Sequence, residues 1–258
     1  MRNLTRRTFL STGPLASLLS IQQTAPQPPD PNFPSQPWTL VQEMVTVSHG
    51  NVARVKELVR ERPALARAAW DWGYGDWETA LGAASHVGNR EIADTLIANG
   101  AHVTIFSAAM LGQLEVVKSF VVAVPGIQRT RGPHGLTLLS HAKAGGSRAA
   151  AVAAYLESLG DADPRYTNET LDEAAVKELA GTYSFGTGSR DRMLVTLNSR
   201  GLAIKREGAI ERNIFHLGGR VFNPAGAEAV RIRFEPLSGR ATTVTIQDGP
   251  VVVTGRLT

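Results

Sequence analysis

The chain has 258 residues, enough for one large or two modest domains, each with its own hydrophobic core. Its formal charge of +4 comes mainly from three arginines in residues 1–25; the remainder has 24 basic and 23 acidic side chains, interspersed, which excludes a phosphate-tracking surface and a nucleic-acid partner. The absence of cysteine excludes disulfides, thiolate nucleophiles and cysteine-based metal sites.

Residues 1–25 have the layout of a secretory signal: a basic start, a moderately apolar stretch and then small and polar residues. Thr5-Arg6-Arg7-Thr8-Phe9-Leu10 resembles the twin-arginine export signal, which a dedicated translocase reads. The resemblance implies an exported bacterial protein, periplasmic or extracellular, with Ala25 as the best candidate for a cleavage site. The apolar stretch of thirteen residues from Phe9 to Ile21 is shorter than the ~20 that span a bilayer, so we expect no membrane span.

A proline-rich segment follows, with six prolines among the twelve residues from Pro26 to Pro37. Proline fixes φ and removes a backbone donor, so residues 26–37 are predicted to form an extended linker. The folded region is therefore expected to begin near Trp38.

Residues 38–165 repeat a pattern of two short helices joined at a glycine, at Gly50, Gly88, Gly112 and Gly145. In each second helix, aliphatic residues recur three and four positions apart, which places them on one buried face. These residues are Val52, Val55, Leu58 and Val59; Ile92, Leu96 and Ile97; Leu114, Val117, Phe120 and Val121; and Val152, Leu156 and Leu159. We predict an array of about four helix pairs that bury their apolar faces by stacking.

The second of these units resembles the ankyrin repeat. Its Thr79-Ala80-Leu81-Gly82-Ala83-Ala84 stands where that family has T-P-L-H-x-A, and Gly100-Ala101 matches the closing G-A. The resemblance implies an ankyrin-type α-solenoid and, since such arrays bind many unrelated proteins, a protein or peptide partner.

The spacing between units is irregular: successive turn glycines lie 38, 24 and 33 residues apart. The short gap leaves almost no room for an inter-repeat finger between Gly100 and Phe106. The long gap adds about five residues, and the addition falls in a stretch that holds three of the four tryptophans. One finger is therefore expected to be lost and its neighbour enlarged.

The enlarged finger contains Trp70, Trp72, Tyr74 and Trp77. Because Trp and Tyr dominate binding hot spots, we interpret these four residues as a partner-contact patch. The alternative is that the rings cover the local core. Trp77 immediately precedes the Thr79 turn and is expected to pack inward, whereas exposure and burial remain equally open for Trp72 and Tyr74.

A second finger, residues 129–135, is basic and rich in turn residues. Its Arg129, Arg131 and His134 are candidates for contact with a carboxylate or polar partner, although a solvated loop is the favoured interpretation. Asp71 and Asp76 of the aromatic finger are similarly explained by turn chemistry.

Residues 166–180 are predicted to form a bridging helix, because Thr170-Leu171-Asp172-Glu173 precedes an alanine-rich run and matches a capping box. The period then changes to two, as in Val230–Glu235 and Thr243–Gln247, with turn signals between the runs. We expect seven or eight short strands in residues 181–258, forming a small antiparallel meander or barrel. The predicted fold class is α+β multidomain.

Leu179-Ala180-Gly181-Thr182-Tyr183 followed by such a meander resembles the accessory β-domain of some exported serine hydrolases of the β-lactamase class. That domain has no catalytic residues of its own, so the resemblance implies none here.

Few residues indicate chemistry. Gly186-Thr187-Gly188-Ser189 lies between two predicted strands and is interpreted as a hairpin turn, and no Gly-x-Ser-x-Gly elbow occurs. Acid pairs such as Asp161 and Asp163 have no partner base nearby in sequence. The histidines show no spacing typical of metal ligation, and two of them occupy turns where ankyrin repeats commonly carry polar residues; the six are His49, His86, His102, His134, His141 and His216. We therefore predict no catalytic residue, metal ligand or cofactor.

Two functions remain compatible with these patterns. The favoured one is an exported, non-enzymatic protein that binds a protein or peptide through the aromatic finger. The other is a small-ligand carrier or enzyme whose site lies in the β-domain. An apolar, filled barrel interior would favour the first, and an open cavity with converging polar groups the second.

Overall fold

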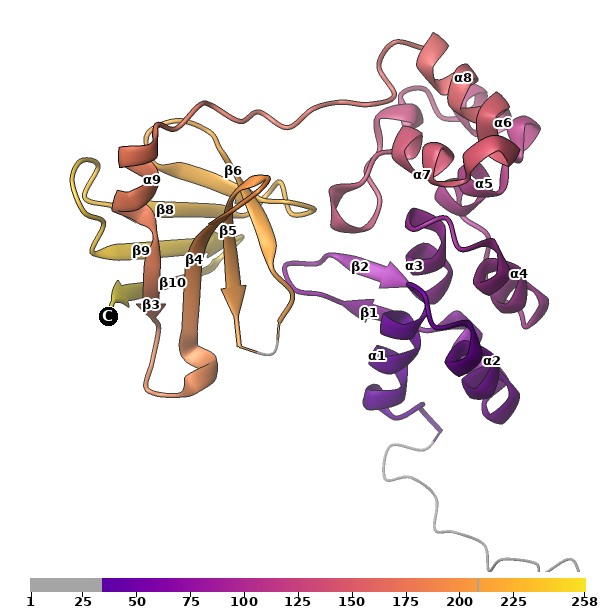
Figure 1. The fold of residues 1–258 in the computed structure, drawn as a ribbon, viewed down its shortest axis with the longest axis horizontal. Coiled ribbons are helices and arrows are strands. Elements are labelled where there is room, and N and C mark those ends of the chain that lie inside the picture. Colours follow the sequence, from indigo (N-terminus) through magenta and orange to yellow (C-terminus); the bar gives the residue numbers. More distant parts are fainter. Residues whose placement is uncertain (1–33, 208) are drawn as a thin grey trace, which may run out of the picture. The chain divides into compact units, whose positions relative to one another are not determined.

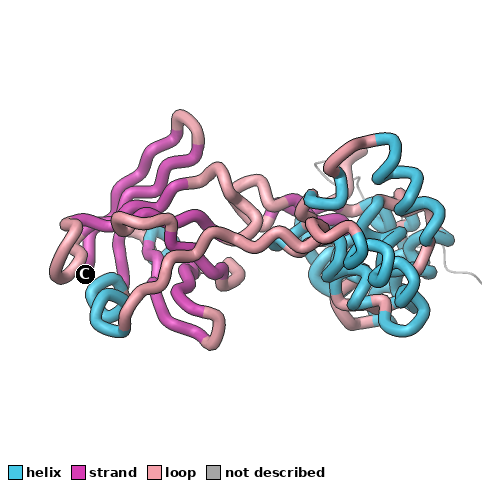
Figure 2. Tube along the Cα trace, turned by 90° about the horizontal axis from the view of Figure 1, so that it is seen from above, coloured by secondary structure: helices cyan, strands magenta, loops and turns pink. Residues whose placement is uncertain are grey.

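A computed structural model describes residues 34–207 and 209–258. Residues Gln36–Thr258 form one compact unit, in which a helical array is followed by a β-barrel (Figures 1 and 2). The predicted α+β class is confirmed. The expected export signal, residues 1–25, lies outside the described residues, as does most of the proline-rich linker.

The helical array consists of consecutive helix pairs at the predicted positions. The pairs are α1 (Trp38–Val47) with α2 (Val52–Glu61), α3 (Ala80–His86) with α4 (Arg90–Ala98), α5 (Ile105–Leu111) with α6 (Leu114–Ala123), and α7 (Leu138–Ala144) with α8 (Ala150–Ser158). Polar side chains begin several of these helices: the Asn51 side chain accepts the Arg54 N–H at 3.1 Å, and Thr79 accepts that of Gly82 at 2.9 Å.

Close packing in the array depends on small residues in the first helix of each pair. Ala83, Ala84, Ala108 and Ala109 are fully buried. Gly88 joins α3 to α4 with a φ of +75°, and a Cβ there would collide with the carbonyl of a neighbouring helix, so only glycine fits. Stacking of the pairs thus supplies the core that no single pair could form.

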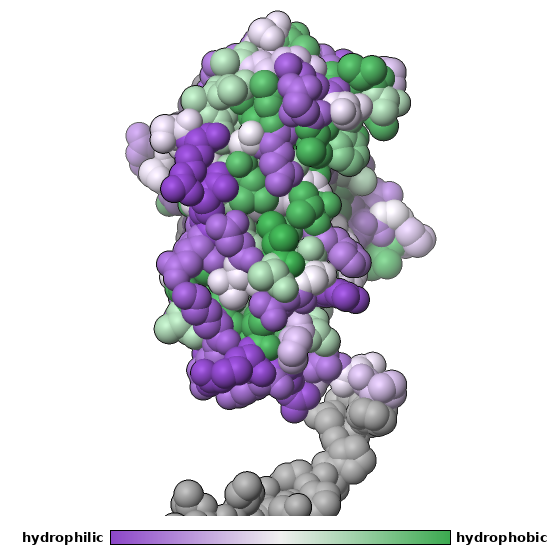
Figure 3. Space-filling view, turned by 90° about the vertical axis from the view of Figure 1, so that its right-hand side faces the viewer, coloured by the Kyte–Doolittle hydropathy of each residue, from purple (hydrophilic) through white to green (hydrophobic). Residues whose placement is uncertain are grey.

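The outer side of the array carries exposed apolar side chains as well as polar ones. Figure 3 shows apolar side chains interspersed with hydrophilic ones on the side that carries α4, α6 and α8. Helix α6 contributes several of the exposed apolar side chains on this side. They are Val116, Phe120 and Val122 within the helix and Val124 directly after it.

The connections differ in length as the sequence predicts. Only six residues separate α4 from α5, whereas a hairpin of β1 (Ala69–Asp71) and β2 (Trp77–Thr79) precedes α3. This hairpin is antiparallel, with Trp70 opposite Glu78. Short 3₁₀ segments complete the connections: η1 (Pro63–Arg67), η2 (Ile127–Arg129), η3 (Pro133–Gly135) and η4 (Gly146–Ala149).

The bridging helix α9 (Glu173–Leu179) is shorter than predicted, and its N-cap is Asp172 rather than Thr170. The Asp172 carboxylate accepts the Ala175 N–H at 2.6 Å, and an acid at this end also suits the helix dipole. Leu179 at the other end is fully buried in the barrel core. None of the helices in the described ranges is long and apolar enough to cross a bilayer.

The C-terminal region is a closed barrel of eight antiparallel strands, in which every strand pairs with its neighbours in sequence and β10 closes onto β3. The predicted barrel is therefore confirmed. Its strands are β3 (Gly181–Ser184), β4 (Arg192–Asn198), β5 (Gly201–Arg206), β6 (Arg212–His216), β7 (Val221–Pro224), β8 (Arg231–Glu235), β9 (Thr243–Asp248) and β10 (Val251–Leu257), with η5 (Ser189–Asp191) in the β3–β4 connection.

The barrel interior is packed with apolar side chains. Tyr183, Phe222 and Phe234 are fully buried, and the Phe234 ring lies edge-on to both of the others, with centroids 5.5–5.6 Å apart. A filled interior does not favour the carrier or enzyme function that was the alternative for this region.

Candidate metal centre

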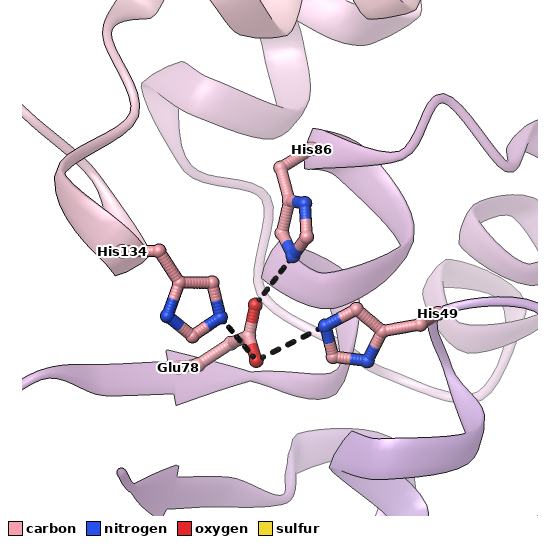
Figure 4. Close-up of side chains that lie close together, drawn as sticks. All are labelled: His49, Glu78, His86 and His134. Atoms are coloured by element: carbon pink, nitrogen blue, oxygen red, sulfur yellow. Dashed lines mark ion pairs between the residues drawn. The ribbon is translucent and has the colours of Figure 1, made fainter. Parts of the chain in front are cut away.

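Three histidines and one glutamate converge in the helical array (Figure 4). They come from four separate elements: His49 from the α1–α2 turn, Glu78 from β2, His86 from the end of α3, and His134 from η3. One nitrogen of each imidazole and one carboxylate oxygen all lie within 4.8 Å of one another. Residues that are up to 85 positions apart in sequence thus form one cluster, which we call the histidine cluster.

Local structure explains why each side chain points into the cluster. Strand β2 alternates, so that Glu78 is fully buried while Trp77 and Thr79 on either side are exposed. His49 and His86 both follow a buried serine whose hydroxyl donates to a carbonyl one helical turn earlier. They therefore occupy equivalent positions in successive helix pairs, and stacking brings their ring centroids to 4.9 Å.

The separations between the Glu78 carboxylate and the three imidazoles are compatible with a metal coordination shell. Glu78 Oε2 lies 3.5 Å from His49 Nε2 and 3.4 Å from His134 Nε2, and Glu78 Oε1 lies 2.9 Å from His86 Nε2. A tetrahedral Zn²⁺ with ligands at 2.0–2.1 Å has neighbouring ligand atoms about 3.3 Å apart. Glu78 Oε1 and His86 Nε2 are only 2.9 Å apart but are not aligned as a hydrogen bond. Both atoms are buried without a hydrogen-bond partner among the described residues. Two neighbouring buried atoms without hydrogen-bond partners could both be ligands of one cation.

The outer ring nitrogens of His49 and His134 each face an acceptor oxygen, so in the neutral ring the inner nitrogen carries the lone pair. His49 Nδ1 lies 3.0 Å from the Thr46 carbonyl oxygen, which accepts only, so Nδ1 holds the proton and Nε2 is free to ligate. His134 Nδ1 donates to Asp76 Oδ2 at 3.0 Å, and the His134 backbone N–H donates to Asp76 Oδ1 at 2.8 Å. A carboxylate or carbonyl behind the imidazole is the usual support of a metal-bound histidine.

The carboxylates of the cluster are supported in the same way. Trp72 Nε1 donates to Glu78 Oε2 at 2.8 Å, which orients the carboxylate. Asp76 is buried and forms a second ion pair at 3.0 Å with Arg212 of β6. Asp76 therefore links His134 to the barrel, and turn chemistry alone does not account for it.

The electrostatics of the cluster favour positive charge. Burial would raise the pKa of Glu78, but contact with His134 and His86 outweighs burial and lowers the pKa to about 2. Burial would likewise lower the pKa of His134, but Asp76 and Glu78 raise it to about 9. Without a metal, the two buried carboxylates hold a proton on His134; a divalent cation can supply the same compensation.

His141 lies beside the cluster but is not part of it. Its ring centroid is 6.4 Å from that of His86, and its Nδ1 donates to the Thr137 carbonyl at 2.9 Å. Burial lowers its pKa to about 4, so His141 is neutral at physiological pH.

The residues predicted to form the aromatic patch are dispersed by the structure. Trp70 and Trp72 are half-buried against the array core, with Trp70 stacked on Trp38, and Tyr74 packs against the barrel core. Trp77 is 63% exposed, so the prediction that it packs inward is wrong. Only one side of β2 can face the interior, and that side carries Glu78.

The residues of the second finger have three different environments. Arg129 is exposed and pairs with Asp161 at 2.9 Å. Arg131 lies over the Tyr166 ring at 3.8 Å and donates to the Gly135 carbonyl at 3.1 Å, so it is used within the molecule. His134 belongs to the histidine cluster.

Sequence analysis predicted no metal ligand and did not group His49, Glu78 and His86. One signal was present: Ser-His recurs where the first helix ends in two successive units, as Ser48-His49 after α1 and Ser85-His86 at the end of α3. In a stacked array, residues at equivalent positions lie beside one another, so a repeated histidine indicates a histidine cluster. No comparable signal marks Glu78.

Comparisons with known proteins do not place this chain in a family. No family model matches it, and no curated protein matches it significantly. Among solved structures, the crystal structure of SurE matches with 22% identity and a TM-score of 0.25, over 45% of this chain and 27% of that chain. The chain thus spans about a quarter of the length of that structure, and a match of this quality supports no conclusion about fold or function.

Proposed function

We propose that the protein binds a divalent transition-metal ion, of which Zn²⁺ is the best fit, through His49, Glu78, His86 and His134. The observation that carries this proposal is the convergence of three imidazole nitrogens on one fully buried carboxylate. Burying these polar groups without a bound ion is costly, and the outer nitrogens of His49 and His134 are already held as in metal-bound histidines.

The donor set selects the class of cation. Imidazole suits Zn²⁺, Cu²⁺, Fe²⁺ and Ni²⁺, whereas Mg²⁺ and Ca²⁺ prefer oxygen ligands. A set of three nitrogens and one carboxylate, with ligand atoms 2.9–3.5 Å apart around Glu78, fits a tetrahedral ion.

The test is calorimetric titration of the full chain with Zn²⁺ after treatment with a chelator. We expect one site per chain. Removing a direct ligand should weaken binding more than the 10–100-fold that is typical of an outer-shell change, so His49→Ala and Glu78→Gln should each cost more than about 100-fold. His49 is suitable because its side chain is partly exposed and its loss should not unfold the array.

The matched control is His102→Ala, because His102 is exposed and lies outside the cluster. It should bind Zn²⁺ like the wild type. Zn²⁺ affinity that His49→Ala and Glu78→Gln leave unchanged would show that the metal is held elsewhere, and the proposal would then be wrong.

A second candidate is the function that the ankyrin resemblance implies: an exported, non-enzymatic protein whose array is an ankyrin-type solenoid and binds a protein or peptide. The exposure of Trp77 favours it, since a large exposed indole on a hairpin is typical of contact surfaces. The apolar side chains exposed on α6 extend the area available to a partner.

This second function is tested by comparing proteins retained from periplasmic extract by the wild type and by Trp77→Ala. Trp38→Ala is the control, because Trp38 is similarly exposed but lies outside the hairpin. A partner that requires Trp77 and not Trp38 would support the candidate. Identical sets of retained proteins for all three chains would count against it.

A further inference from the structure

A pocket lies between the β1–β2 hairpin and the barrel, within the compact unit. Its volume is about 310 Å³, which is within the range of small-molecule sites. Trp72 and Tyr74 line it from the hairpin, and residues of β5 and of the segment before β6 line it from the barrel. None of the four residues of the histidine cluster lines it, so the pocket is separate from the proposed metal site.

Aromatic and aliphatic side chains form much of the pocket wall. Trp72 and Tyr74 are half-buried, and Ile210 is 39% exposed although its side chain is aliphatic. Ile204 adds a nearly buried aliphatic side chain from β5. Aromatic and aliphatic surfaces of this kind suit a flat, apolar ligand.

The charged side chains that line this pocket, among the described residues, are all basic. Arg212 pairs with Asp76 at 3.0 Å, so its charge is compensated. Lys205 and Arg206 are exposed at the end of β5 and form no ion pair in the part of the chain that the structure describes. Arg206 Nε donates to the Arg190 carbonyl at 3.0 Å, which fixes the guanidinium but leaves its positive charge uncompensated.

The acidic side chains nearby line other pockets. Glu211 lines the pocket next to the histidine cluster, and Asp191 and Asp248 line a third pocket. Within residues 34–207 and 209–258, none of these three acids forms an ion pair with Lys205 or with the neighbouring arginine of β5. The wall of the hairpin–barrel pocket therefore carries a net positive charge.

The backbone at Tyr74 has a conformation that L-residues rarely adopt. Its φ is +59°, and Gly73 and Gly75 on either side have φ values of +105° and +74°. A tyrosine there costs free energy that a glycine would not, and strained backbone of this kind is typical of functional sites. Here it holds the Tyr74 ring against the barrel core and in the pocket wall, with the Arg212 guanidinium 6.0 Å from the ring centroid.

We propose that this pocket binds a small aromatic carboxylate, with its ring against Trp72 and Tyr74 and its carboxylate on Lys205 and Arg206. Basic side chains form charge-assisted hydrogen bonds with carboxylates, and aromatic faces stack on one another. A single negative charge suits a wall whose remaining side chains are mostly apolar. This function goes beyond metal binding and does not depend on it.

The experiment is equilibrium dialysis of the full chain, in the presence of a chelator, with three probes that share one ring system. The probes are 2-naphthoate, the neutral 2-naphthylmethanol and the cationic 2-naphthylmethylamine. We expect one naphthoate per chain, bound at least 10-fold more tightly than the alcohol, because only the carboxylate forms charge-assisted hydrogen bonds. The amine should bind most weakly, because the wall is basic.

Substitutions assign the binding to this pocket. Lys205→Gln and Arg206→Gln should each weaken naphthoate binding about 10-fold and leave the affinity for the alcohol unchanged. Tyr74→Ala should weaken the binding of both probes, because it removes the ring that they share as a contact. Arg256→Gln is the matched control, since Arg256 is exposed on β10 and does not line the pocket, and it should bind naphthoate like the wild type.

The proposal fails if naphthoate does not bind, or if the three probes bind with equal affinity, which would indicate apolar contact without charge recognition. It also fails if Lys205→Gln and Arg206→Gln both bind naphthoate as tightly as Arg256→Gln. A loss in either variant, with the alcohol unaffected, supports it. Because the chelator removes metal ions, each of these results is independent of whether the histidine cluster binds Zn²⁺.

Discussion

The helical array and the β-barrel bury different kinds of side chain. The array encloses the carboxylates of Asp76 and Glu78, each almost completely buried, whereas the barrel core is built around Tyr183, Phe222 and Phe234. The charged side chains that the barrel buries are basic, Arg212 and Arg220. Buried polar groups lower the stability of the fold unless hydrogen bonds or opposite charges compensate them, whereas buried apolar side chains raise it. The contrast indicates that the buried carboxylates make the array less stable than an apolar core would and are kept for a binding site, while the barrel core serves as a scaffold.

The largest change in the free energy of unfolding is expected for a substitution in the barrel core. Phe234→Ala should lower the free energy of unfolding by about 3–5 kcal/mol, because a fully buried aromatic ring would leave a cavity. Zn²⁺ affinity at a temperature where the variant is folded should be unchanged. Denaturant unfolding and calorimetric titration measure the two effects. A loss of Zn²⁺ affinity would show that the barrel core does more than support the fold.

The second prediction concerns a buried histidine of the array. The pKa of folded His141, about 4, lies below its ordinary value of 6.5, so between these values only the unfolded chain takes up the proton. The contribution of neutral His141 to the stability of the folded protein is complete above pH 6.5 and is lost as the pH falls toward 4. Between pH 6.5 and 4.5 the metal-free protein should lose about 2 kcal/mol through this group.

This pH window isolates His141. The raised pKa of His134 changes stability only above pH 6.5, and the lowered pKa of Glu78 only below 4.5. Urea unfolding at the two pH values should therefore show a smaller loss in His141→Gln, with His102→Gln as the control that behaves like the wild type. An unchanged loss in His141→Gln would contradict the assignment.

The third prediction tests the support of the Glu78 carboxylate. Trp72→Phe removes the indole N–H that donates to Glu78 Oε2 at 2.8 Å but keeps an aromatic ring in place. We expect Zn²⁺ affinity to fall about 10-fold, as for other outer-shell partners of metal sites. Trp70→Phe is the control, since Trp70 lies in the same hairpin but its indole donates no hydrogen bond to the Glu78 carboxylate. Equal affinity in both variants would show that the indole does not orient Glu78.

The smallest change in the free energy of unfolding is expected for a substitution of Trp77. Because its side chain is exposed, Trp77→Ala should change the free energy of unfolding by less than about 0.5 kcal/mol. Thermal unfolding of the variant beside the wild type measures this change. A drop of several degrees would mean that the indole packs in solution, and Trp77 would then lose its place in the protein-binding candidate.

Much of the architecture was predictable because local patterns specify it. Aliphatic residues at helical spacing predicted the paired helices, and their buried members Val55, Leu58 and Ile92 form the core face. Strict alternation predicted β8 and β9, and the turn residues between strands predicted a meander. The short connection between α4 and α5 followed from the spacing of glycines alone.

The candidate site was only partly predictable. His134 appeared among the candidates, but as a contact for a partner, and the repeated Ser-His pattern indicates a cluster only when the stacking of the units is considered. Trp77 and Glu78 show why the remainder was missed: hydrophobicity favours burying the tryptophan, yet the strand buries the glutamate. Preferences of single residues are overridden where three histidines from other elements surround the inward position.

Local sequence is sufficient to specify which segments are helices and which are strands, because those choices depend on residues within a few positions of one another. The meeting of His49, Glu78, His86 and His134 depends instead on tertiary structure, since the stacking of helix pairs and the direction of one hairpin bring them together. Tertiary structure likewise determines that Tyr74 packs against the barrel core while Trp77 stays exposed. Such contacts arise from the packing of whole elements, which no local pattern encodes.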